Sequence, residues 1–438
     1  MPVAHMTRAL VPALSRGRGA FVSPLLAVLL TLTACARPAP THEPMAVSFL
    51  PAPGEFLTAS GERLAPEALR SRAAKAAYIL VGESHGNACD HEAEARVLTI
   101  LAHGKTLPDP QLVVGLEMAP ASLNPVLKEF AEGRIALEEL EARLDWKTNW
   151  GHPFAKYLPV LRAMRDWKLP VVGLNVPPGV IRRLSAAAMQ NATAGNTPGD
   201  STMVGSMTEA SVARLSPEDR AMLPARIILP APEQLAFLNE VMSQHQQAGQ
   251  KGREASDPRQ VARFQLIQSV WDSGMAEQAV RARKAFGRPV VVLAGVAHVE
   301  GGLGIARRIR VLDPEAEVLL ISPWRGDGLD TADADLRVYC PESFESRMGL
   351  ILTSRPWGQG FEYVVSAVQR GSRAEAAGLR PGDVVERAGG HRMRSLSAMH
   401  LAGSDAFREK KSLVLVVRRG EEAYSVDLGP LGQPGGRP

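Results

Sequence analysis

Two short motifs of the form Gly-x-x-His place ionisable residues directly after runs of apolar residues. In the first, Gly82 precedes Glu83 and His85, and in the second, Gly295 leads to His298. Both motifs follow a run of Val, Ile, Leu and Ala, which is typical of a buried parallel strand. Glycine permits a sharp turn, so we expect each histidine to lie beyond the end of its strand. Imidazole and carboxylate groups can bind a transition metal or transfer protons.

Two further apolar runs end in the same way. Glu117 follows a strand-like run and Gly115, and Asn175 follows another run and Gly173. In open α/β sheets, ligands bind beyond the carboxyl ends of the strands. If the four strands are neighbours, their polar residues converge on one cleft. Each residue taken alone could simply satisfy a hydrogen bond at a strand end, but the two histidines and two glutamates together favour a site. The residues expected in this cleft are Glu83, His85, Glu117, Asn175 and His298.

Short apolar runs alternate with segments of helical periodicity. Five runs predict strands, at residues 78–81, 112–114, 170–172, 290–294 and 318–321. A helix is expected to begin near Asn87 or Asp90, since either side chain can cap it. The alternation predicts an α/β fold with a central, mostly parallel sheet flanked by helices. A mobile loop at 191–207 and a helical insertion at about 210–286 are expected beside the cleft.

The first 34 residues have the features of a lipoprotein signal peptide. Three arginines precede an apolar stretch, and Leu-Thr-Ala then leads to Cys35, followed by Ala36. This pattern predicts a chain that is acylated on Cys35 and anchored to a membrane outside the cytoplasm. In a cell with two membranes, the anchor is expected in the outer membrane and the protein in the periplasm. A plain secretory signal is the alternative. Prolines predict an extended tether at 35–54, and residues 429–438 are expected to be a disordered tail.

Charge and cysteine content narrow the classes of partner. The chain has 50 Lys and Arg against 46 Asp and Glu, and three of the arginines belong to the signal. The mature chain is nearly neutral, and no basic stripe predicts a nucleic-acid partner. Cys89 and Cys340 could pair in an oxidising compartment, but two cysteines so far apart give no disulfide framework. Cys89 is expected to be a small apolar residue at the start of a helix.

Several longer motifs contain these cleft residues. The first reads Glu83-Ser-His85-Gly-Asn87-Ala-Cys-Asp90-His91. The others are Gly115-Leu-Glu117, Trp150 to Tyr157, Gly173-Leu-Asn175, Gln268-x-x-x-Asp272-x-x-Met275-Ala276 and Gly295-Val-Ala-His298-Val299. As an ordered set covering nearly all of residues 75–310, they resemble the ChaN-like haem-binding lipoproteins of the Tiki superfamily. The resemblance implies that an α/β domain at 55–340 binds haem and acts in iron acquisition or haem handling. Whether the chain forms a homodimer is left open.

Axial ligation of haem iron needs a histidine, tyrosine, cysteine or methionine that faces an apolar slot. The candidates are Tyr157, His85, His91, His152 and His298. Tyr157 also fits an apolar helix face, and His91 also fits a solvated helix start. Asn175 and Gln268 complete the predicted haem site. Trp150, Trp271 and Met275 could line the slot or belong to the core. Covalent attachment is excluded, since no Cys-x-x-Cys-His occurs.

A hydrolase interpretation stays open because the superfamily includes Tiki-type metalloproteases and erythromycin-esterase-like hydrolases. In this interpretation a divalent transition metal such as Zn, Mn or Fe is held by Glu83, His85, Glu117 and His298. Glu83 or Glu117 would be the catalytic base. Ser84 lacks the Gly-x-Ser-x-Gly pattern of a serine nucleophile. Of the three possible functions, we rank haem or iron handling first, a metal-dependent hydrolase or peptidase second, and a non-catalytic scaffold third.

A second resemblance covers residues 345–428. The segment Ala376-Ala-Gly378-Leu-Arg-Pro381-Gly382-Asp383 is similar to a turn of bacterial PDZ domains, and strand-like runs precede and follow it. The resemblance implies a small, mainly β domain that binds a partner's C-terminal peptide as an added strand. The residues assigned to the peptide groove are Gly349, Leu350, Ile351, Met399 and His400. An empty groove, or one occupied by the chain itself, is the alternative.

Overall fold

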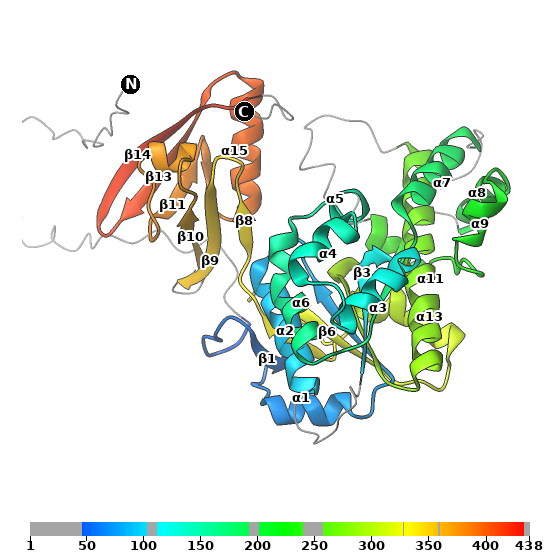
Figure 1. Ribbon diagram of the computed structural model, residues 1–438. Coiled ribbons are helices and arrows are strands. Elements are labelled where there is room, and N and C mark those ends of the chain that lie inside the picture. The colour runs from blue at the N-terminus through cyan, green and yellow to red at the C-terminus, as the bar shows by residue number, and fades with distance from the viewer. Residues whose placement is uncertain are drawn as a thin grey trace, which may run out of the picture. The chain divides into compact units, whose positions relative to one another are not determined.

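The chain folds into two compact units. The computed structural model (Figure 1) describes residues 46–102, 112–191, 201–239, 257–326, 328–357 and 360–432. The first unit is Ala46–Pro341 and the second begins at Glu342. The predicted signal, Cys35 and residues 35–45 of the tether lie outside the described residues. In the described part of the chain, no helix is long and apolar enough to cross a membrane.

The first unit contains one sheet and the helices around it. Its strands are β1 (Glu55–Thr58), β2 (Tyr78–Glu83), β3 (Val113–Pro120), β4 (Val171–Asn175), β5 (Val290–Gly295), β6 (Val318–Trp324) and β7 (Leu336–Tyr339). Its α-helices are α1 (Pro66–Ala73), α2 (Ala88–Ala102), α3 (Asn124–Ala131), α4 (Leu137–Arg143), α5 (Trp146–Asn149), α6 (Leu158–Asp166), α7 (Pro178–Asn191), α8 (Ser201–Ala213), α9 (Pro217–Ala221), α11 (Pro258–Phe286), α12 (Val296–Val299) and α13 (Ile305–Leu312). Three 3-10 helices complete it, η1 (Ala121–Leu123), η2 (Phe154–Tyr157) and η3 (Glu300–Gly302).

The sheet has the strand order β1-β7-β6-β2-β5-β3-β4. All neighbouring pairs are parallel except β1, which runs antiparallel to β7. The predicted mostly parallel α/β fold is confirmed, and the five predicted strands correspond to β2 to β6. The sequence analysis missed β1 and β7, which form one edge of the sheet and are each only four residues long.

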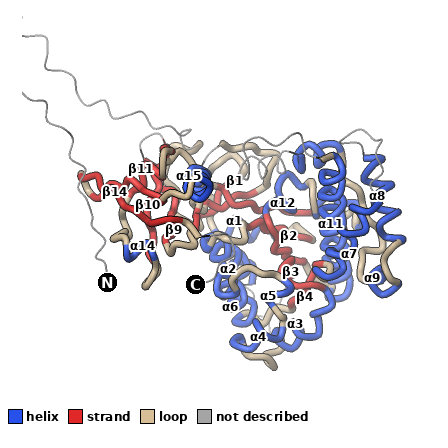
Figure 2. The backbone as a smooth tube through the Cα atoms, turned by 90° about the horizontal axis from the view of Figure 1, so that it is seen from above, coloured by secondary structure: helices blue, strands red, loops and turns tan. Residues whose placement is uncertain are grey.

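Helices cover both faces of this sheet (Figures 1 and 2). On one face, Ile79 of β2 and Val291 of β5 pack against α2 and α6. On the other, Leu80 and Val292 pack against α11 and α13. Successive strand residues point to opposite faces, so strands buried on both sides consist of uninterrupted apolar runs. This is why the runs in the sequence located the strands.

The predicted helical insertion forms its own apolar cluster. α7, α8 and α11 contribute buried residues such as Leu184, Val204 and Leu266. The loop predicted at 191–207 is wrong from Ser201 onward, where α8 begins, and residues 192–200 lie outside the described part. The Gly, Ser and Thr of this segment have low helix propensity, which tertiary packing overrides.

The expectation for Cys89 is wrong, because it is paired. Cys89, at the start of α2, forms a disulfide with Cys340, directly after β7, and their Cα atoms are 5.6 Å apart. The tether is also shorter than expected. Gly54 donates a backbone hydrogen bond to Tyr339, and Ala46 donates one to Gly326, so residues 46–54 lie on the first unit. The predicted tail begins later, since a strand continues to Pro430.

The second unit is an antiparallel sheet with two helices. Its strands are β8 (Ser343–Glu345), β9 (Leu350–Trp357), β10 (Gly360–Val368), β11 (Val384–Ala388), β12 (His391–Arg392), β13 (Ser412–Arg419) and β14 (Glu422–Pro430), and its helices are α14 (Arg373–Ala376) and α15 (Leu396–Arg408). The strand order is β14-β13-β11-β10-β9-β8, with β12 beside β11. Leu352, Val365 and Ala402 are among the residues of its core. The prediction of a small, mainly β second domain is confirmed.

Candidate functional site

The four strands that end in polar residues are consecutive neighbours in the sheet, in the order β2-β5-β3-β4. β2 and β5 pair in parallel so that Glu83 lies beside Gly295. The two Gly-x-x-His motifs, far apart in the sequence, therefore leave the sheet side by side. Since β3 follows β5, Glu117 extends the same edge. The predicted convergence of these strand ends is observed.

Glu83 is the centre of the first group of side chains. Its carboxylate is buried, and one oxygen lies 2.5 Å from His85 Nδ1 while the other lies 3.0 Å from His91 Nε2. The Tyr157 hydroxyl donates to the first oxygen at 3.2 Å. Burial alone would raise the pKa of Glu83, but its hydrogen bonds to the two histidines outweigh that and lower it to about 2. Glu83 is thus an ionised acceptor whose two oxygens are already engaged.

His85 is the member of this group that reaches solvent, with 30% of its side chain exposed. Burial by itself lowers the pKa of His85, but the Glu83 carboxylate holds it above its ordinary value. With Nδ1 held by Glu83, the other ring nitrogen is turned away from this carboxylate. The rings of Trp150 and His152 lie against His85, with centroids 4.6 Å and 4.9 Å away. An apolar ligand that contains a metal ion needs a nitrogen to bind the metal and apolar rings to pack against. His85 and the rings beside it provide both.

The glycine of the second motif is needed for a close approach and not for a sharp turn. The φ angle of Gly295 is −52°, which any residue can adopt. A Cβ at Gly295 would lie 2.8 Å from His85 Cε1 and 3.1 Å from Nε2. The expectation that glycine turns the chain here is therefore wrong. The position is restricted because the His85 ring packs directly on it.

His298 has a different environment, between two carboxylates. Its Nδ1 lies 2.6 Å from Asp272 of α11, its Nε2 lies 3.5 Å from Glu117, and the residue is 6% exposed. Burial would lower the pKa of His298, but the charges of Glu117 and Asp272 raise it to about 9. His298 is thus an imidazolium at neutral pH. A protonated ring has no lone pair with which to bind a metal.

Glu117 and Asn175 are fixed by the backbone around them. Glu117 accepts a hydrogen bond from the Gly295 N–H at 2.6 Å. Asn175 donates to the Glu117 carbonyl oxygen at 3.1 Å and accepts from the Val176 N–H at 2.8 Å. Both residues lie at the predicted edge. Asn175 holds β3 and β4 together at their ends.

The polar residues of the first motif also position the loop that follows β2. Asn87 caps α2 by accepting from the Cys89 N–H at 3.0 Å. Asp90 accepts from the Ser84 N–H at 2.8 Å and forms an ion pair with Arg325 at 2.6 Å. The Ser84 hydroxyl in turn accepts from Arg325 at 2.9 Å. Sequence reasoning missed Arg325, which lies directly after β6 and has no motif to identify it.

Three further residues behind the site were not predicted as site residues. Asp272, named only as part of a motif, holds both His298 and the buried Arg308, 3.2 Å away. Arg308 interrupts the apolar face of α13 between Ile305 and Ile309, and that was its signal in the sequence. Glu94 of α2 is fully buried, and among the described residues neither of its carboxyl oxygens has a hydrogen-bond partner. Burial and the nearby Glu83 charge raise the pKa of Glu94 far above its ordinary value.

The remaining predicted ligands lie deeper than a haem slot requires. Tyr157 is 2% exposed and His91 is fully buried, with ring centroids 4.2 Å apart. Met275 belongs to the core, whereas Trp271 and Gln268 are half-buried on α11. In the described part of the chain, no three His, Cys, Asp or Glu residues are arranged to hold a metal ion. The oxygens of Glu83 are instead engaged with His85 and His91, and the nitrogens of His298 face Asp272 and Glu117.

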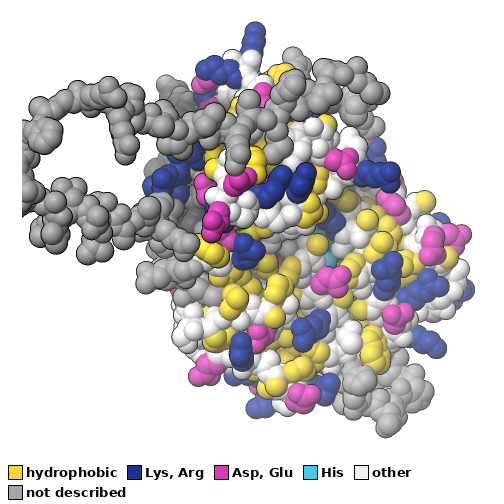
Figure 3. All heavy atoms as spheres, turned by 90° about the vertical axis from the view of Figure 1, so that its left-hand side faces the viewer, with side chains coloured by type: hydrophobic (Ala, Val, Ile, Leu, Met, Phe, Trp, Pro, Cys, Tyr) yellow, Lys and Arg dark blue, Asp and Glu magenta, His cyan; other side chains and the backbone are white. Residues whose placement is uncertain are grey.

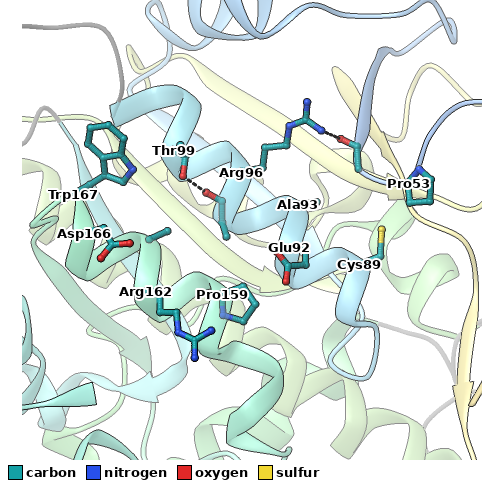
Figure 4. Close-up of a pocket in the computed structure, with 13 residues that line it drawn as sticks. Pro53, Cys89, Glu92, Ala93, Arg96, Thr99, Pro159, Arg162, Asp166 and Trp167 are labelled. Atoms are coloured by element: carbon teal, nitrogen blue, oxygen red, sulfur yellow. Dashed lines mark hydrogen bonds between the residues drawn. The ribbon is translucent and has the colours of Figure 1, made fainter. Parts of the chain in front are cut away.

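The surface of the unit also has a groove of about 800 Å³ between α2 and α6 (Figure 4). It is lined by exposed side chains such as Glu92, Arg96 and Arg162 and contains none of the strand-end residues. On the face shown in Figure 3, acidic and basic side chains are interspersed with apolar ones. Neither feature competes with the strand ends as a site for chemistry.

A family model described as "Haem-binding uptake, Tiki superfamily, ChaN" matches residues 69–309, which is more than half of the chain. The chain belongs to this family. The match begins in α1 and ends in α13, so it contains Glu83, His85, Glu117, Asn175 and His298, whereas Arg325 lies beyond it. No curated protein matches the chain.

Three solved structures are among those to which the chain is similar. ChaN of Campylobacter jejuni, described with cofacial haem binding, is 17% identical, and the match covers 65% of this chain and 96% of that one with a TM-score of 0.49. An EreC erythromycin esterase mutant is 14% identical over 86% of this chain and 95% of its own, with a TM-score of 0.33. The type III effector HopBA1 is 11% identical over 63% and 92%, also with a TM-score of 0.33.

Proposed function

We propose that this ChaN family member binds haem at the carboxyl ends of β2 and β5, and that His85 is its axial ligand. The observation that carries the proposal is the Glu83–His85 pair, with a 2.5 Å contact to Nδ1 and a ring that is partly exposed. Histidines that bind metals are commonly held by a carboxylate on their second nitrogen. Bound haem would supply an iron centre, and the lone pair of His85 would hold it. Membership of this family supports a proposed role in iron acquisition or haem handling.

The buried residues behind His85 have a positioning role in this proposal. Tyr157 and His91 bind Glu83, and Glu83 orients His85. Neither Tyr157 nor His91 can reach a ligand at the surface without leaving the core, since both are buried. With His298 held between two carboxylates, His85 and His152 are the partly exposed candidates, and the proposal takes His85 because Glu83 holds its Nδ1. Trp150 and His152 form the wall beside it.

The test is a haem titration of residues 36–438, followed by absorbance at the Soret band. We compare the wild type with His85→Ala and, as a matched control, Tyr157→Phe. We expect His85→Ala to weaken saturable binding by about a hundredfold and to change the Soret position, because the iron–nitrogen bond is lost. Tyr157→Phe removes one hydrogen bond to Glu83 and should leave the spectrum unchanged. If Tyr157→Phe abolishes binding and His85→Ala does not, the ligand of the iron is Tyr157 rather than His85.

A second function is supported by a separate observation, the His298–Glu117 pair. An imidazolium held by Asp272 and facing a carboxylate is a proton donor, which hydrolysis of an ester or amide requires. In this alternative the chain is a hydrolase or peptidase and a divalent metal is recruited with the substrate. The assay is hydrolysis of a chromogenic ester, with and without chelator, by wild type and His298→Gln. Equal rates for the two proteins would exclude this alternative.

We also propose that the chain is anchored by lipid on Cys35, outside the cytoplasm and at the outer membrane of a two-membrane cell. The support is the lipobox sequence, together with the Cys89–Cys340 disulfide, since stable disulfides are typical of oxidising compartments. Cys35→Ala should release the protein from the membrane fraction. Retention of the variant in that fraction would exclude lipid anchoring on this residue.

The second unit is proposed to be a PDZ module that binds the C-terminus of a partner protein. The support is the Pro381-Gly382-Asp383 turn, where Gly382 has a φ of 93° and Asp383 is held by Arg419 at 2.6 Å. The predicted groove residues Gly349, Leu350 and Ile351 lie at the start of β9. Met399 is buried on α15 and His400 is exposed.

A further inference from the structure

The strand β9 of the second unit has a neighbour on each of its edges. One edge pairs with β10 along the whole strand. The other edge pairs with the three residues of β8, with Ser343 opposite Thr353, Phe344 opposite Leu352 and Glu345 opposite Ile351. One hydrogen bond extends the pair beyond β8, from the Ser354 N–H to the Glu342 carbonyl at 2.9 Å. The second edge is therefore occupied by the segment that enters the unit.

The loop between β8 and β9 is closed on itself. The Gly349 N–H donates to the Ser346 carbonyl at 2.9 Å, and the Met348 N–H donates to the Ser346 hydroxyl at 3.1 Å. Gly349 has a φ of 83°, and a Cβ there would lie 2.2 Å from Ser372, so the loop requires glycine. Backbone N–H groups at this loop are the ones that the PDZ resemblance assigns to a peptide carboxylate. In this structure two of them already have an acceptor from the chain.

The polarity of β8 matches that of an added peptide. β8 is antiparallel to β9, so its carboxyl end points toward the loop at residues 346–349. A peptide that binds by strand addition with its terminal carboxylate at this loop runs in the same direction. Phe344 also packs against the core of the unit. Thus β8 takes both the backbone edge and a side-chain position that such a peptide would use.

We infer that β8 is an intramolecular occupant of a peptide-docking edge, and that a partner's C-terminal segment with an aromatic residue next to its last position takes its place on β9. The inference rests on the PDZ proposal and names its partner class. β8 is three residues long with half-buried or exposed side chains, so its pairing with β9 is short. Because β8 is tethered to β9, it competes with the partner at a high effective concentration. The apparent affinity of the partner equals its intrinsic affinity multiplied by the fraction of chains in which the edge is open.

The test uses residues 36–438 and a labelled peptide with the sequence of residues 341–345, Pro-Glu-Ser-Phe-Glu, with a free carboxylate. Binding is followed by fluorescence anisotropy for wild type, Phe344→Pro and the control Ser343→Ala. Proline has no N–H to donate to β9 and cannot take part in the ladder. We expect Phe344→Pro to bind the peptide at least tenfold more tightly than wild type, and Ser343→Ala to bind like wild type. Phe344→Ala, which keeps the N–H, serves as a milder second variant.

Three outcomes overturn the inference in different ways. If wild type and Phe344→Pro bind the peptide equally, β8 does not compete, and the PDZ proposal stands without it. If neither folded protein binds any C-terminal peptide, both proposals fail. Hydrogen exchange of the Ser354 amide in the wild type is independent of any peptide. Exchange at the rate of an exposed amide would show that Glu342 does not cover it and would also overturn the inference.

Discussion

The two Gly-x-x-His motifs look alike in the sequence and have opposite environments in the fold. His85 has one carboxylate partner, and part of its ring reaches solvent. His298 has carboxylates on both nitrogens and is almost fully buried. Their strands are direct neighbours, so the difference does not come from position in the sheet. Both rings have a carboxylate on Nδ1, which is Glu83 for His85 and Asp272 of α11 for His298. The difference comes from Glu117 of β3, which lies 3.5 Å from His298 Nε2.

The comparison separates two roles. A histidine with a free nitrogen at a surface can bind a ligand, whereas a histidine fixed as an imidazolium between carboxylates stabilises the fold or donates a proton. Three experiments test whether the two histidines differ in this way, and a fourth tests the buried Glu94 behind them.

The largest effect is expected from Asp272→Ala. The substitution leaves two buried cations, His298 and Arg308, without their shared carboxylate. Removing one partner of a buried ion pair costs about 3–5 kcal/mol of folding free energy. Urea denaturation measures this loss of folding free energy. Asp405→Ala is the control, because that carboxylate pairs with His391 at a partly exposed site. A loss below about 1 kcal/mol would show that His298 is not held as an ion pair.

The next effect is on the ligand position, through Gly295→Ala. The new Cβ would lie 2.8 Å from His85 Cε1, so the ring must move. We expect haem affinity to fall about tenfold, which corresponds to about 1.4 kcal/mol. Gly82→Ala is the matched control, since its Cβ would meet Val296 at 3.3 Å and no histidine. If the two variants bind haem equally, the position of His85 does not govern binding.

The third effect is the pH dependence of haem binding. The pKa of His85 is raised, and only its deprotonated nitrogen can bind iron, so affinity should rise with pH through that pKa. The pKa of His298 is about 9, above its unfolded value, so its contribution to stability is full below about pH 6.5 and is lost as the pH rises through 9. Haem titrations at pH 6, 7 and 8 and thermal melts from pH 6 to 10 measure the two separately. Affinity that is independent of pH would argue against His85.

The smallest effect is expected from Glu94→Gln. The pKa of Glu94 is raised on folding, so its stabilising contribution is present below about pH 4.3 and decreases as the pH rises toward its folded value. The neutral amide removes that dependence. We expect the melting temperature to rise by a few degrees at pH 8 and to change little at pH 4. A lower melting temperature at pH 8 would mean that Glu94 is ionised and has an unseen partner.

The two units differ in how well their sequences predicted them. In the first unit, buried parallel strands are apolar on both faces, so their runs could be found, but β1 and β7 are too short to give such a signal. In the second, the Pro-Gly-Asp turn identified the neighbourhood of β11. The pairing of β8 with β9 could not be predicted, because a three-residue edge strand has no distinctive pattern.

The α/β class, the family and the strand ends that carry Glu83, His85, Glu117 and His298 could be predicted from the sequence, because these follow from local runs and motifs. The solvent exposure of His85, the position of Tyr157 against Glu83 and the pairing of Cys89 with Cys340 became known from the folded chain. The Tyr157–Glu83 hydrogen bond joins residues 74 positions apart, and the disulfide joins residues 251 positions apart. Local sequence patterns carry no information about which of those distant residues will meet.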